Sequence, residues 1–196
     1  MTDERVAQHV ANELLEVPPS SAISLQMSVD HYLEVLRGVL DMFASKRQVD
    51  IIYVTSTISF ESIKRVMEAL DIDTSRVYFV DCISHLMMGA SSGEMDEQVT
   101  LVESPTMLEN VMLKTEYLIR LSEAEEKLVV IDSINSLAIH NNNWILSEFL
   151  HILVSGLRAR NVLTVILSVE EHSTPEIANM VNLVCDHGIR TDTKEG

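Results

Sequence analysis

The residues of this sequence that could do chemistry follow short apolar runs with the character of strands. Asp30 and His31 come after the run AISLQM, and Asp132 ends the run KLVVID. Carboxylates, imidazoles and amides can hold a small ligand, a metal ion or a reacting proton. If the strands are parallel, their carboxyl ends meet at one edge of a sheet, where the ligand sites of open α/β proteins form. The candidate crevice residues at that edge are Asp30, His31, Thr57, Asp81, His85, Asp132 and Asn135.

No motif selects a metal centre or a nucleophile among these residues. The sequence contains no HxH, HExxH or HxxxH pattern. It also lacks the G-x-S-x-G turn that exposes a nucleophilic serine, and Ser133, which follows Asp132, has no flanking glycines. Cys82 and Cys185 lie far apart and outside any CxxC pair, so we expect two buried, reduced thiols. We therefore expect no metal site, no catalytic residue and no cofactor.

The elements that must position the candidate residues alternate between strands and helices. Helical periodicity covers residues 3–15, and a wide apolar helical face runs from Leu33 to Phe43. Apolar and β-branched runs predict strands at Ala22–Met27, Asp50–Thr55, Arg76–Asp81, Val99–Val102, Lys127–Ile131 and Val162–Val169. Further helices are expected from Ser59, from Ser104–Pro105, over Leu146–Leu157 and from Thr174–Pro175.

Near-continuous apolar strands separated by helices are typical of a parallel sheet that helices cover on both faces. We predict an α/β fold with a three-layer, doubly wound, mainly parallel sheet. Val181–Val184 is interpreted as a last strand, with room for a C-terminal antiparallel hairpin partner after Gly188. Residues 1–20 are expected to form an N-terminal helix and linker, and residues 21–196 a single domain.

The charge of the chain argues against nucleic acid as a partner. Lys and Arg number 14 against 30 Asp and Glu, which gives a formal net charge of −16. An anionic nucleic-acid backbone would be repelled, and the basic residues form scattered pairs rather than a stripe. No apolar run approaches the ~20 residues that cross a bilayer, and the start MTDERVAQHV lacks the pattern of a signal peptide. We expect a cytoplasmic protein with no nucleic-acid and no membrane partner.

Three segments together resemble the RecA/KaiC-like superfamily of P-loop ATPases. Lys127–Leu137 (KLVVIDSINSL) resembles the Walker B strand, four apolar residues ending in a carboxylate. Ile51–Leu70 is similar to the second strand and its helix, and Leu163–Arg190 to the sensor strand and closing segment. The resemblance spans residues 22–190 and implies a RecA-like sheet. It also implies a tendency of relatives to form dimers or rings.

The sequence departs from this superfamily at the two places that would bind and hydrolyse ATP. A P-loop needs GxxxxGK[ST], because backbone N–H groups and a lysine hold the phosphates. No glycine here precedes a lysine, and the turn after the first strand, within Leu25–Val35, places Asp30 where phosphate would sit. Asp132 matches the Walker B carboxylate, but Thr57 and Ile58 stand where active members carry their catalytic Glu pair. Neither side chain can take a proton from water near neutral pH.

The sequence therefore predicts a degenerate, non-catalytic member, a pseudo-ATPase rather than an enzyme. We expect it to regulate or scaffold through a protein partner or through self-association. The alternative is a small-molecule-binding domain, or a diverged enzyme, that uses the strand-end crevice. Trp144, the one tryptophan of the chain, is expected to pack in the core, with a partner interface as the alternative.

Overall fold

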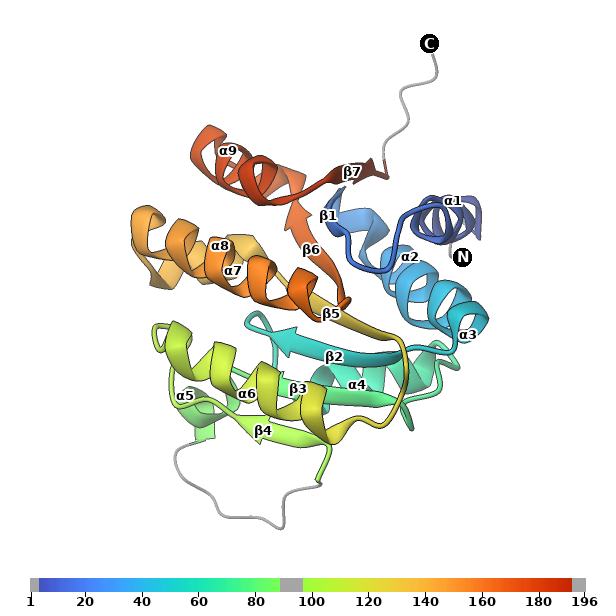
Figure 1. The fold of residues 1–196 in the computed structure, drawn as a ribbon, viewed down its shortest axis with the longest axis horizontal. Coiled ribbons are helices and arrows are strands. Elements are labelled where there is room, and N and C mark those ends of the chain that lie inside the picture. The colour runs from blue at the N-terminus through green and yellow to red at the C-terminus, as the bar shows by residue number, and fades with distance from the viewer. Residues whose placement is uncertain (1–3, 89–96, 192–196) are drawn as a thin grey trace.

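The computed structural model describes residues 4–88 and 97–191. Seven strands in this part of the chain form one sheet in the order β4-β3-β2-β5-β6-β1-β7, and every neighbouring pair is parallel (Figure 1). The strands are β1 (Ala22–Met27), β2 (Asp50–Thr55), β3 (Val77–Asp81), β4 (Val99–Leu101), β5 (Lys127–Asp132), β6 (Leu163–Val169) and β7 (His187–Arg190).

Helices cover both faces of this sheet and complete the three layers. The α-helices are α1 (Glu4–Leu15), α2 (Tyr32–Leu36), α3 (Ala44–Arg47), α4 (Phe60–Ala69), α5 (Ser84–Met88), α6 (Leu108–Leu121), α7 (Ile134–His140), α8 (Asn143–Ala159) and α9 (Pro175–Val184). Short 3-10 turns form η1 (Val29–His31) and η3 (Glu170–His172), and a π-helical stretch, η2 (Arg37–Phe43), joins α2 to α3.

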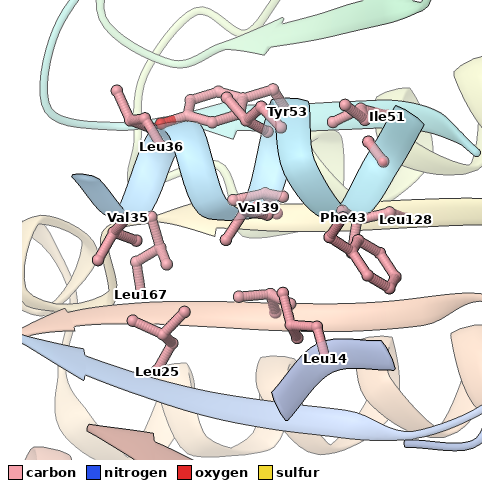
Figure 2. Packing of buried hydrophobic residues seen from close by; sticks show 14 of the residues in the cluster. Leu14, Leu25, Val35, Leu36, Val39, Phe43, Ile51, Tyr53, Leu128 and Leu167 are labelled. Carbon is pink, nitrogen blue, oxygen red and sulfur yellow. The ribbon is translucent and has the colours of Figure 1, made fainter. Parts of the chain in front are cut away.

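Side chains alternate between the two faces along each strand and so feed two separate cores. On one face, strand residues pack with α1, α4 and the continuous α2–η2–α3 segment. Val35, Val39 and Phe43 of that segment point toward the sheet, where Leu128 and Leu167 lie (Figure 2). On the other face, strand residues pack with α6, α7, α8 and α9. Full burial of each such aliphatic or aromatic side chain contributes roughly 1.5–3 kcal/mol.

The structure confirms the α/β class and the parallel, three-layer arrangement, but the prediction of an antiparallel hairpin at the C-terminus is wrong. Val181–Val184 is the last turn of α9, with Val181 and Val184 buried against the second core. The closing strand, β7, pairs with β1 in parallel, Ile23 opposite His187 and Gln26 opposite Arg190. A helix fits the segment because its apolar residues recur with helical spacing from Ile177 onward.

The expected helix start at Ser104–Pro105 is also wrong, by one turn. The Ser104 hydroxyl accepts from the N–H of Thr106, and the N–H of Met107 donates to the Ser104 carbonyl at 2.9 Å. The serine and proline therefore form an isolated turn, and α6 begins only at Leu108. A serine followed by proline is equally suited to both roles, so local sequence does not choose between them.

Candidate functional site

All seven strands point the same way, so the segments that follow them gather at the carboxyl edge of the sheet. Most of the expected crevice residues lie along this edge, but in separate environments. The ends of β1, β5 and β6 are neighbours in the sheet, and their following turns contact each other through side chains.

The turn after β1, where the resemblance places a phosphate loop, is closed by a carboxylate from elsewhere in the chain. Glu171 of η3 accepts from the Ser28 hydroxyl at 2.8 Å. Both of its carboxylate oxygens also lie 3.2 Å from the backbone nitrogen of Val29. The hydrogen bond from Ser28 is the largest cause that lowers the pKa of Glu171, so this group is an anion at neutral pH.

The other N–H groups of the same turn have partners too. The Ser28 nitrogen donates to the Thr191 hydroxyl at 3.4 Å, and the Asp30 nitrogen to the Ser28 hydroxyl at 3.4 Å. The His31 nitrogen donates to the Ser28 carbonyl at 3.0 Å, and the His31 ring lies 3.1 Å from the Thr191 hydroxyl. All four backbone donors from Ser28 to His31 are thus occupied from within the protein. The Asp30 side chain itself is exposed, so the anion held by this turn is Glu171.

Asp132, the carboxylate at the end of β5, is held by two tyrosines. It is 2 % exposed, and its Oδ2 accepts from the Tyr32 hydroxyl at 2.6 Å and from the Tyr53 hydroxyl at 2.5 Å. Burial raises the pKa of Asp132, and the two hydrogen bonds lower it in part. Burial likewise raises the pKa of both tyrosines, which therefore stay protonated as donors.

Asp81, at the end of β3, ties together the turn that follows it. Its two oxygens accept from the backbone nitrogens of Phe60, Ile83 and Ser84 and from the Ser84 hydroxyl, at 2.5–2.8 Å. A fully buried carboxylate with four donors has little capacity left for a ligand. His85 lies half-buried in the next helix, α5.

Asn135, in the first turn of α7, binds the end of β6. Its side-chain oxygen accepts from the Val169 nitrogen at 2.8 Å, and its side-chain nitrogen donates to the Val169 carbonyl at 3.3 Å. This paired contact holds α7 against the sheet. Thr57, which follows β2, has an exposed side chain.

A cavity of about 800 Å³ lies at the same edge, between α7, the start of α8 and the start of α9. Its walls come from residues 133–143 and 169–177, together with Thr57. Of the seven expected residues only Thr57 and Asn135 line it. The structure therefore does not bring the predicted crevice residues into one site.

The described residues contain no group of three or more His, Cys, Asp and Glu side chains placed to hold a metal ion. Burial raises the pKa of the Cys82 and Cys185 thiols to about 12, which makes both poor nucleophiles and poor metal ligands. Within the same part of the chain, no helix combines the length and the apolar character that a membrane crossing requires.

Sequence reasoning missed Tyr32, Tyr53 and Thr191, and it placed Glu171 at this edge without foreseeing its contact with the turn after β1. The contacts of Tyr32 with Asp132 and of Glu171 with Ser28 join residues 100 and 143 positions apart. Local spacing carries no signal for such pairs.

Trp144 does not pack in the core, contrary to expectation. It is 72 % exposed at the start of α8, where the Asn142 side chain accepts from its backbone nitrogen. The cap fixes Trp144 in the first turn of α8, and the buried face begins two residues later at Leu146.

Comparisons with known proteins agree with this fold. A family model described as the KaiC ATPase matches residues 42–196, so the match begins after the Ser28–His31 turn. A KaiC-like protein from Pyrococcus horikoshii has a similar structure, with a TM-score of 0.55, 16% identity and coverage of 83% of this chain and 68% of that one. The flagellar accessory protein FlaH from Methanocaldococcus jannaschii is also similar in structure, with a TM-score of 0.59 and 13% identity. The alignment covers 97% of this chain and 77% of that one. Curated protein sequences yield no match. With more than half its length matched, the chain belongs to the KaiC ATPase family within the RecA/KaiC-like superfamily.

Proposed function

We propose that this KaiC-family chain does not hydrolyse ATP and acts through contacts with protein partners, in regulation or scaffolding. The observation that carries the proposal is the turn after β1. A triphosphate site offers free backbone N–H groups, usually with a lysine. Here the four N–H groups from Ser28 to His31 already donate to protein oxygens, and no lysine follows.

The charge of the same turn opposes a phosphate. The Glu171 carboxylate sits 3.2 Å from the Val29 nitrogen, at the point where a phosphate oxygen would have to accept. A bound nucleotide would therefore have to displace one anion with another and break the Ser28 contact as well. Since like charges at such distances repel, this exchange is unfavourable.

The groups that would assist hydrolysis are also unsuited to it. Mg²⁺ is held by a carboxylate together with phosphate oxygens, whereas Asp132 is buried and already accepts from two tyrosines. Thr57 and Ile58 replace the expected glutamates and cannot activate water. These features support a non-catalytic role.

Exposed apolar side chains support the second half of the proposal. Ile139 is 81 % exposed and Trp144 72 %, on α7 and α8 respectively. Large apolar groups that remain in water are features of interaction surfaces, and tryptophan is enriched at their centres.

A second candidate is a small-molecule-binding domain, favoured by the 800 Å³ cavity. Cavities of this size accommodate metabolites. A thermal-shift screen of nucleotides, metal ions and metabolites tests it, since a ligand that binds only the folded chain raises the melting temperature.

Calorimetric titration with Mg·ATP, combined with a phosphate-release assay, tests the main proposal. We expect no saturable heat up to about 1 mM nucleotide and no release above background. An active KaiC ATPase serves as positive control. Glu171→Ala is measured in parallel with Glu170→Ala, its exposed neighbour. Low-micromolar binding with turnover by the unaltered chain would overturn the proposal, and binding confined to Glu171→Ala would show that the carboxylate is the obstacle.

A further inference from the structure

The cavity between α7, α8 and α9 offers mainly apolar surface to an occupant, although many of its lining residues are polar. Several of those polar groups have hydrogen-bond partners inside the protein. The pairs are Ser133 with Ser136, Ser136 with Ser56, Thr174 with Ile177, and Asn135 with Val169. These contacts use part of the hydrogen-bonding capacity that the lining could offer to a polar metabolite. The apolar part of the lining consists of Ala138, Ile139, Val169 and Ile177.

Exposed apolar residues lie on and directly after the cavity lining along the chain. Ile139 lines the cavity and is 81 % exposed. Trp144 and Ile145, in the first turn of α8, are 72 % and 52 % exposed, directly after the lining residue Asn143. Large apolar groups held in water beside a hollow of this volume are suited to receiving the apolar side chains of another protein.

The charge around the cavity selects the partner. Of the described residues, no lysine or arginine lines the cavity, whereas Glu176 does. The backbone nitrogen at its own position and the Thr174 hydroxyl lower the pKa of Glu176, so it is ionised at neutral pH. A second copy of the chain carries the same formal charge of −16, which disfavours it relative to a basic partner. A basic partner would be attracted and oriented by the same field.

We propose that the cavity and its rim bind an amphipathic, basic segment of another protein. Its apolar side chains fill the cavity against Ile139 and Ile177, Trp144 closes over them, and a lysine or arginine pairs with Glu176. The inference rests on the protein-contact half of the proposed function and names its surface and its partner chemistry.

Trp144 makes the test direct, because it is the single tryptophan of the chain and lies at the proposed contact. The probe is a tryptophan-free helical peptide of leucine and lysine, titrated while Trp144 emission is followed. We expect a saturable shift of the emission to shorter wavelength, weakened by added salt. A peptide with glutamate in place of lysine should leave the emission unchanged.

Two variants separate the proposed site from general attraction to an acidic protein. Ile139→Ser should weaken peptide binding and raise the dissociation constant about tenfold. Glu176→Gln should also weaken peptide binding, and it should reduce the salt dependence of the affinity. Leu183→Ser is the matched control, because Leu183 is 79 % exposed but does not line the cavity. Circular dichroism confirms that each variant folds.

Equal affinity in Ile139→Ser and the unaltered chain would overturn the inference, as would the absence of any Trp144 shift. Sedimentation of the chain alone gives an independent check, since an Ile139-dependent dimer would make a second copy the occupant. None of these outcomes depends on nucleotide. The ATP titration therefore judges the non-catalytic proposal separately from this surface.

Discussion

Replacing Gly38 by alanine should destabilise the protein by loosening α1 from η2, the helical stretch that contains Gly38 and packs against α1. A Cβ atom at Gly38 would stand 2.6 Å from the Ala7 carbonyl oxygen and 3.1 Å from Val10 Cβ. Ordinary contact begins near 3.4 Å, so the α1 backbone would have to retreat by about 0.8 Å. A backbone oxygen cannot rotate away as a side chain would. Val10 and Leu14 of α1 are fully buried in the first core and would move with it.

The magnitude follows from two opposing effects. Alanine is favoured over glycine within a helix by up to about 1 kcal/mol. Overpacking a well-filled contact costs about 1–3 kcal/mol. We expect Gly38→Ala to lose about 1–2 kcal/mol of unfolding free energy, because the obstacle is backbone.

Gly156 of α8 provides the matched control, since a Cβ there meets nothing within 4 Å. Gly156→Ala should gain about 0.5–1 kcal/mol from helix propensity alone. Urea unfolding followed by circular dichroism measures both variants, and limited proteolysis shows whether α1 has detached. A Gly38→Ala protein as stable as the unaltered chain would refute the close packing of α1 on η2. The expectation that residues 1–20 form an N-terminal helix and linker beside a domain of residues 21–196 is addressed by the same proteolysis.

Two further predictions concern polar contacts of the sheet. Tyr53→Phe removes one of the two donors to Asp132 and should lower the free energy of unfolding in urea by about 1–3 kcal/mol. Tyr117→Phe, at a 52 % exposed position, is the control and should change the free energy of unfolding by less than about 0.5 kcal/mol. Equal effects of the two substitutions would contradict the contact. The hydrogen bond from the Ala22 nitrogen at 2.8 Å is the largest cause that lowers the pKa of Asp186 below its usual 3.8. The stabilisation is therefore present above pH 3.8 and lost as pH falls through the folded-state pKa. Asp186→Asn should lower the free energy of unfolding by about 0.5–1 kcal/mol at pH 7, and in acid its stability should approach that of the unaltered chain. Urea unfolding at neutral and at acid pH measures this, and a difference independent of pH would contradict it.

Much of the scaffold could be predicted from local sequence. The strands Ala22–Met27 and Asp50–Thr55 were predicted to the residue, because a run of apolar and β-branched residues has few alternatives in a buried parallel sheet. The helix caps at Ser59 and Thr174 were likewise evident from a hydroxyl before an apolar periodic segment. The segment at Val181–Val184 was misassigned since three apolar residues in a run of four satisfy a strand and a helix equally.

The candidate site was predicted less well than the strands that support it. Asp30, His31, Asp81 and Asp132 lie at or just after the ends of predicted strands, and all lie near the carboxyl edge of the sheet. Their roles differ because each meets a different set of partners. Asp81 accepts hydrogen bonds from the turn that follows it, and Asp132 accepts from two tyrosines. The side chain of Asp30 is exposed to solvent. Only Thr57 and Asn135 of the expected set reach the cavity.

By itself the sequence determined the order of strands and helices, the acidic charge, and the lack of a glycine–lysine phosphate loop, since these depend on residue types and near neighbours. Tertiary structure alone decided that Glu171 closes the turn after β1, that Tyr32 and Tyr53 hold Asp132, and that a cavity opens beside α7. Those contacts join segments far apart in the chain. The distances between these segments depend on which strands lie side by side in the sheet. That spatial arrangement is a property of the packed molecule rather than of any local pattern in the sequence.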